Sequence, residues 1–184
     1  MWRHRAAQPE MSGKNSAFST KRGFFPEPVN RVHQLSGYVM TEFRIVSETT
    51  RLWRLPLDAR ELARVLGSFC RTIAAQERPL PERLVLRLAD DGIIADANAR
   101  LMGCAGPTNI LTFPGDGSLP GELLLSLDTW ERECRLYRQP PLSHLLRLLA
   151  HGMAHMTGLD HGPEMAALEQ FCLQSLPESI PVRA

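Results

Sequence analysis

Three of the chain's six histidines fall within one short stretch, HGMAHMTGLDH, from His151 to His161. Because an α-helix has 3.6 residues per turn, His151 and His155 lie only about 40° apart around a helix axis, so both imidazoles can reach one ion. Gly158 stands where glycine commonly ends a helix, and the turn lets His161 fold back. The spacing therefore predicts a metal site with three histidine ligands.

Three neutral imidazoles leave a tetrahedral zinc ion with one open position, as in catalytic zinc sites. Imidazole also suits nickel and iron, so we predict one Zn²⁺ per chain but allow another divalent metal. The spacing H-x-x-x-H-x-x-G-x-x-H is that of the metzincin proteases, yet Gly152 occupies the position of their glutamate general base. This difference disfavours peptide hydrolysis.

Several neighbouring side chains could assist such an ion. Asp160 could hold the second ring nitrogen of a ligand histidine, or it could stabilise the turn through its own backbone. Glu122 and Glu164 could act on a metal-bound water, although the sequence places neither against it. Arg147, one turn before His151, could contact a substrate or be an exposed helix arginine. These alternatives remain open.

His144 lies seven residues before His151 on nearly the same helix face. The two residues are separated by about 10.5 Å along the axis, which is too far for both to bind one ion. We therefore expect His144 on the helix surface or facing a substrate.

The apolar pattern predicts the elements that must position these residues. Strands are expected at 42–48, 83–90, within 106–115 and at 122–128, and helices at 58–73, 93–103, 128–137, 143–156 and 163–176. Asp58 and Glu61 form a capping-box pattern at the first helix, and Asp91-Gly92 is read as a turn. The order βαβαββααα indicates an α+β fold, in which helices cover a small mixed sheet of about four strands. The metal site then lies on a helix and turn near the C-terminus.

Composition sets the remaining limits. The chain has 184 residues and a formal net charge of +1, which fits one domain and excludes a strongly basic nucleic-acid coat. Residues 1–39 carry six basic and two acidic residues with few periodic apolar positions. We expect a disordered basic extension at 1–39 and a single domain at 40–184.

Compartment and membrane association follow from the same composition. The four cysteines are scattered without a C-x-x-C pair, which indicates reduced thiols. The sequence has no membrane-length apolar run and no secretory signal at its N-terminus, so we expect a cytoplasmic protein without a membrane partner.

Three segments resemble one known family. HGMAHMTGLDH resembles the H-G-x-L-H-L-x-G-x-D-H signature of the YbeY family of bacterial metal-dependent endoribonucleases. NARLMGCAGPTNILTFP, residues 98–114, is similar to that family's N-x-x-Y-R-x-x-x-x-P-T-[ND]-V-L-S-F-P segment. GELLLSLD, residues 121–128, is similar to the G-D-[IL]-x-I strand that follows it. The order and separation of these segments also agree with the family.

The resemblance implies a zinc-dependent endoribonuclease specific for single-stranded RNA. It would act in the maturation of ribosomal RNA, at the 3′ end of the small-subunit RNA, and in ribosome quality control. Its implied partners are this RNA, the ribosome and ribosome-associated proteins. His151, His155 and His161 carry over as metal ligands, and Thr108 and Asn109 match the loop that would contact substrate beside them.

One position departs from the family pattern. Met102 stands where the family has arginine, whose planar charged group binds phosphate in a way that methionine cannot. Arg100 would point nearly the opposite way on a helix, so Arg147 is the better replacement, and Asp160 is the other catalytic candidate. Two functions stay open. The chain is a nuclease that tolerates Met102, or it is a non-catalytic zinc-containing module that binds ribosomes or proteins.

Overall fold

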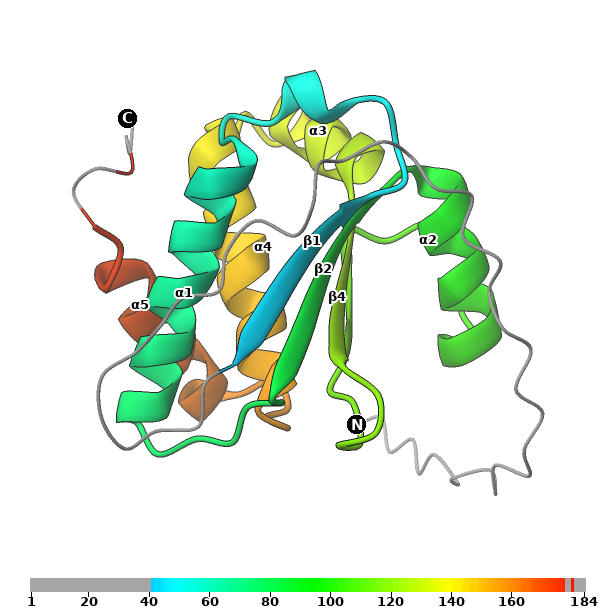
Figure 1. Cartoon of the computed structure of the whole chain (residues 1–184). Helices are drawn as coiled ribbons and strands as arrows, with labels where there is room; N and C mark the ends of the chain where they lie inside the picture. Colours follow the sequence, from blue (N-terminus) through cyan, green and yellow to red (C-terminus); the bar gives the residue numbers. More distant parts are fainter. Residues whose placement is uncertain (1–40, 178–179, 181–184) are drawn as a thin grey trace, which may run out of the picture.

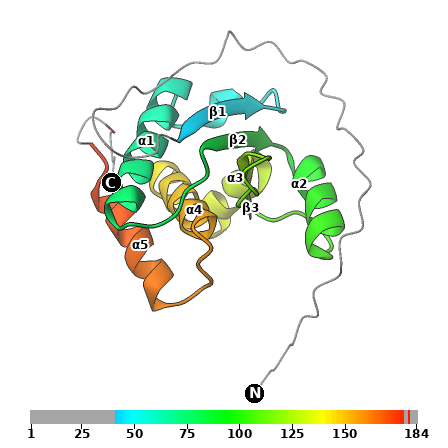
Figure 2. The ribbon, with the colours of Figure 1, turned by 60° about the horizontal axis from the view of Figure 1, so that its bottom comes forward.

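A four-stranded mixed sheet separates two unequal layers of helices (Figures 1 and 2). The computed structural model of the chain describes residues 41–177 and residue 180, so the extension predicted at 1–39 lies outside the described residues. The strands are β1 (Glu42–Ser47), β2 (Arg83–Ala89), β3 (Ile110–Phe113) and β4 (Gly121–Ser126), arranged β1-β2-β4-β3. β1, β2 and β4 are parallel, and β3 is antiparallel to β4.

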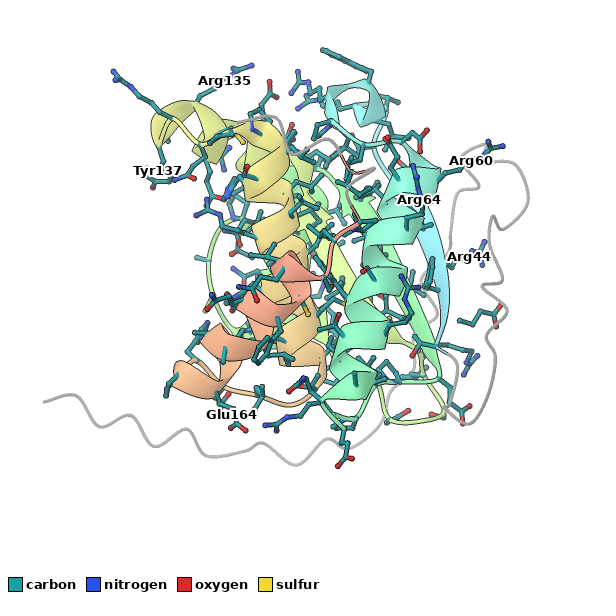
Figure 3. The ribbon with its side chains drawn as sticks, turned by 90° about the vertical axis from the view of Figure 1, so that its left-hand side faces the viewer. Arg44, Arg60, Arg64, Arg135, Tyr137 and Glu164 are labelled. Carbon is teal, nitrogen blue, oxygen red and sulfur yellow. The ribbon has the colours of Figure 1, made fainter. Side chains whose placement is uncertain are left out.

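The larger layer contains α1 (Ala59–Ala75), α4 (Pro141–Met156) and α5 (Pro163–Gln174), which lie together on one side of the sheet (Figures 1 and 3). α2 (Asp91–Ala97) lies on the other side, and α3 (Leu127–Leu136) follows β4 at the end where the parallel strands finish. The predicted α+β class, the mixed sheet and the order of the main elements are therefore confirmed.

Local capping explains where the helices begin. Asp58 and Glu61 form the predicted capping box, with both of its hydrogen bonds at 2.8 Å. The expected turn at Asp91-Gly92 is wrong, because Asp90 caps α2 by accepting from the Ile93 amide and helix starts one residue later. A π-helical turn, Asn98–Met102, extends α2 to Gly103, whose φ of 67° ends it.

The main core fills the space between the sheet and α1, α4 and α5. β2 and β4 direct alternate leucines towards it, namely Leu84, Leu86, Leu88, Leu123 and Leu125. α4 packs closely on the sheet at Gly152, where an added Cβ would lie 2.8 Å from Leu123 Cδ2 and 2.9 Å from Ile110 Cδ1. A larger residue at the position that aligns with the protease glutamate would require these two core side chains to move.

The opposite face of the sheet has a smaller apolar cluster. Ala89, Ile94, Leu111 and Leu124 pack there beneath α2. Within the part of the chain that the structure describes, no helix is both long and apolar enough to cross a bilayer.

Candidate metal centre

The last two turns of α4 carry His151 and His155, and the following loop returns His161 to them. α4 ends at Met156, and Gly158 adopts the left-handed φ of 83° while its amide donates to the His155 carbonyl at 2.9 Å. A side chain at Gly158 would strain this turn. The glycine thus allows the chain to reverse and bring the third imidazole against the first two.

The three imidazoles gather around one point. One ring nitrogen from each lies within 4.8 Å of the others. The Nε2 atoms of His155 and His161 are 3.3 Å apart. Two ligand nitrogens that are each about 2.05 Å from a tetrahedral ion would be separated by about 3.3 Å. The donor set and its spacing therefore fit a divalent metal ion that prefers imidazole.

The other ring nitrogens of two of these histidines are already engaged. His151 Nδ1 lies 2.9 Å from the Glu169 carboxylate, and His155 Nδ1 lies 2.8 Å from the Leu159 carbonyl. Because both oxygens can only accept, each Nδ1 donates, and Nε2 keeps its lone pair for an ion. Burial lowers the pKa of His155 below 6.5, and the neighbouring His151 and His161 lower it further, so the ligating neutral form is favoured.

Glu169 was not singled out by sequence reasoning. It lies on α5, eight residues beyond His161, and only the packing of α5 against α4 brings it to His151. One sequence feature could have identified Glu169: it lies beside Leu168 and near Cys172, two buried residues of α5. A carboxylate next to the apolar face of a helix can reach the element on which that face packs.

His144 differs from its expected place on the helix surface or facing a substrate. Its exposed fraction is 8%, and its Nε2 donates to Glu133 at 2.8 Å. The same carboxylate accepts from the side-chain amide of Asn109 at 3.1 and 3.2 Å. Glu133, on α3, thus joins α4 to the loop that carries Thr108 and Asn109, both half-buried.

The remaining candidates are spread over several surfaces. Met102 is 57% exposed at the end of the π-helical turn, and Arg100 is paired there with Asp96. Arg147 is exposed on α4, where it donates to Gln139 and, at 3.3 Å, to His144 Nδ1. The structure therefore brings Arg147 to His144 and leaves Met102 open to solvent.

The three acidic candidates do not share one environment. Asp160 is exposed beside His161. Glu164 lies at the start of α5, where it pairs with Arg78. Figure 3 shows Glu164 at the opposite end of the molecule from Arg135 on α3. Glu122 pairs with Arg87. Because the flanking Leu123 faces the core under α4, the Glu122 side chain lies on the α2 side of the sheet.

The thiols lie apart from this chemistry. Cys70, Cys104, Cys134 and Cys172 are all free. Burial raises the pKa of Cys70 and of Cys172 to about 12, which keeps both thiols protonated and unreactive.

Comparisons with known proteins find relatives of this chain. The profile of a family described as Endoribonuclease YbeY matches residues 49–176. Endoribonuclease YbeY of Nitratidesulfovibrio vulgaris is 40% identical over 142 residues, covering 64% of this chain and 84% of that protein. The protein of the same name from Lawsonia intracellularis is 38% identical over 122 residues, with 66% and 85% covered.

One solved structure supports the fold alone. The solution structure of a Thermotoga maritima protein has a TM-score of 0.52 and 20% identity, and covers 73% of this chain and 88% of that one.

Proposed function

The chain belongs to the YbeY family of endoribonucleases, and we propose that it cleaves single-stranded RNA with the help of one metal ion, zinc first, held by His151, His155 and His161. The observation that carries this proposal is the orientation of the histidines. Three imidazoles converge, and two of them have the far ring nitrogen occupied by protein oxygens. A purely structural zinc site would commonly be closed by a fourth protein ligand.

The chemistry divides between the ion and the chain. When bound, such an ion polarises a phosphoryl oxygen and lowers the pKa of a water molecule. Glu169 and the Leu159 carbonyl hold two imidazoles in the orientation and tautomer that ligation needs. Asp160 is exposed beside the third histidine and is our candidate to accept a proton.

We assign substrate contacts to the loop that carries Thr108 and Asn109 and to Arg147. Glu133 holds Asn109 firmly, since its carboxylate also accepts from His144. Arg147 is exposed one turn before His151, and its guanidinium is the group that we propose in place of the family arginine, where this chain has Met102. An unpaired strand suits this arrangement, because its phosphates can approach a recessed ion without the bulk of a duplex.

The natural substrate in this proposal is ribosomal RNA at the 3′ end of the small-subunit species. The chain would then act in the cytoplasm, where it contacts ribosomes or ribosome-associated proteins during maturation and quality control. These assignments rest on the family alone.

Cleavage of an unstructured RNA by zinc-loaded protein tests the proposal. A His155→Ala variant, purified identically, excludes contaminating ribonuclease, and His4→Ala is the matched control because it changes a histidine outside both the cluster and the proposed substrate contacts. We expect cleavage by the wild-type protein and loss of cleavage in His155→Ala and after chelation. Equal cleavage by wild type and His155→Ala, or none by either, would overturn the nuclease proposal and leave a metal-containing binding module.

A further inference from the structure

A groove of about 1130 Å³ lies on the face of the sheet that α1, α4 and α5 leave free. α2 and the π-helical turn form one wall, residues of β2, β3 and β4 form the floor, and the C-terminal end of β1 and the loop before β4 complete the lining. Its apolar surface comes from Ile93, Leu101, Phe113, Leu119 and Leu124. α2, which lines the groove, and α4, which carries His151 and His155, lie on opposite sides of the sheet (Figure 1), so the groove is separate from the metal centre.

The charged groups of the groove are mostly acidic. Arg87 lies between Glu48 and Glu122, with N–O distances of 2.6 and 2.7 Å, and all three side chains are about three-quarters buried. Asp96 and Arg100 pair on the α2 side. Three carboxylates thus meet two guanidinium groups, and the groove has a net negative charge.

This face of the sheet is incompletely covered. Parallel strands normally have helices on both faces, because their side chains are apolar on both sides. Here α2 packs on β3 and β4 (Figure 2). Val46 on β1 and Val85 on β2 are only half-buried. A segment that lay along the groove would bury this apolar surface and replace water against the parallel strands.

We propose that the groove is the docking site of the segment that precedes β1 in the same chain, with Phe24 and Phe25 against its apolar part. Residues 1–40 carry six basic and two acidic residues, which complements the acidic groove. The sequence GFFPEPVN supplies two adjacent phenylalanines and two prolines, and burial of the phenylalanine rings against the apolar side chains of the groove favours docking.

The chain enters the sheet at the correct end for this contact. Thr41 donates to the Pro81 carbonyl at 3.0 Å just before β1 begins. The strand register places Phe43, Leu84 and Gly121 side by side, and Gly121 follows Leu119 and Pro120, which line one end of the groove.

The linker is also long enough. Fifteen residues separate Phe25 from Thr41, and they can span up to about 50 Å, whereas a six-residue strand is about 20 Å long. Docking in the same chain therefore needs no rearrangement of the sheet.

The chain provides its own probes for a test. Its only lysines are Lys14 and Lys21, so a carbodiimide that joins amines to carboxylates reports where this segment lies in the full-length protein. With Phe24 in the groove, the Lys21 amine lies within about 10 Å of its carboxylates. Mass spectrometry should find Lys21 joined mainly to Glu48, Asp96 and Glu122, the three carboxylates of the groove.

Matched variants test the role of the phenylalanines outside the described fold. Replacing Phe24 and Phe25 together by serine should lower the yield of these cross-links at least about tenfold, because buried phenylalanine contacts are lost. Phe18→Ser, in the same segment, should leave the yield unchanged. Cross-links directed instead to Glu61, Glu77 and Glu164, or an equal yield in all variants, would overturn the proposal.

Mixing normal and ¹⁵N-labelled protein separates contacts within a chain from contacts between chains. Cross-links confined to one isotopic form support docking in the same chain. Mixed pairs that increase with protein concentration would overturn it in favour of a second copy as the occupant.

Discussion

His144 and His151 occupy the same face of α4, two turns apart, and each pairs with a glutamate from a neighbouring helix. The difference lies in which ring nitrogen is used. Glu133 takes Nε2 of His144, and Arg147 donates to its Nδ1, so both ring nitrogens are engaged within the protein. Glu169 takes Nδ1 of His151 and leaves Nε2 towards two further imidazoles. A histidine becomes a candidate ligand through its second partner, not through its place on a helix alone.

The largest expected effect is on zinc affinity, when His151 in the cluster and His144 outside it are each replaced by alanine. His151→Ala should weaken zinc binding by well over 100-fold, more than changes to outer partners usually do, because one of three ligands is lost. His144→Ala should leave the zinc affinity within a few-fold of wild type. Competition with a chromophoric chelator measures both. A similar loss in His144→Ala would remove the distinction between the two histidines.

Replacing Glu169 and Glu133, the glutamate partners of His151 and His144, tests the same difference between the two histidines. Glu169→Gln should weaken zinc binding about 10–100-fold, since a neutral amide holds the His151 ring less firmly and makes it a weaker base. Glu133→Gln should leave zinc affinity unchanged and instead lower the free energy of unfolding by about 1 kcal/mol through its bonds to Asn109 and His144. Chelator competition and urea denaturation, applied to both variants, separate these effects. Equal zinc affinities of the two variants would contradict this division.

A substitution where α4 contacts the sheet should change the free energy of unfolding of the metal-free protein. Gly152→Ala should destabilise the protein by about 1–3 kcal/mol, because its Cβ would overlap Leu123 and Ile110. Gly162→Ala is the control, since its Cβ would find its nearest atom at 3.9 Å, and it should change stability by less than about 0.5 kcal/mol. Urea denaturation of metal-free protein measures both variants. Equal stabilities would mean that α4 can move away from the sheet without cost.

The smallest expected effect is on the pH dependence of stability, and it concerns Asp91, a carboxylate whose hydrogen-bond partners include no histidine. Burial alone would raise the pKa of Asp91, but hydrogen bonds from Ser126, Thr129 and Arg132 lower it below 3.8. A lowered pKa stabilises the fold above the unfolded-state value and loses that contribution as the pH falls through the folded-state value. Wild-type stability should therefore fall more steeply than that of Asp91→Asn below about pH 4. Parallel slopes in acid denaturation would rule out this contribution.

Local patterns predicted much of the fold and the metal centre. The spacing of His151, His155 and Gly158 depends only on helical geometry and on the backbone freedom of glycine, and the Asp58 cap depends on groups three residues apart. The strands and most helix bounds followed from apolar periodicity. The start of α2 was misplaced because Asp91-Gly92 was read as a turn, whereas Asp90 caps a helix that begins at Asp91.

The sequence by itself therefore determined which three histidines cluster, their helical spacing and the order of strands and helices, because these depend on residues close together along the chain. Only the tertiary structure decided the partners of the histidines. Glu169 reaches His151 through the packing of α5, and Glu133 buries His144 through the packing of α3. The close packing of Leu123 and Ile110 around Gly152 likewise comes from the sheet. These contacts join distant segments, and their geometry is set by how the helices pack on the strands.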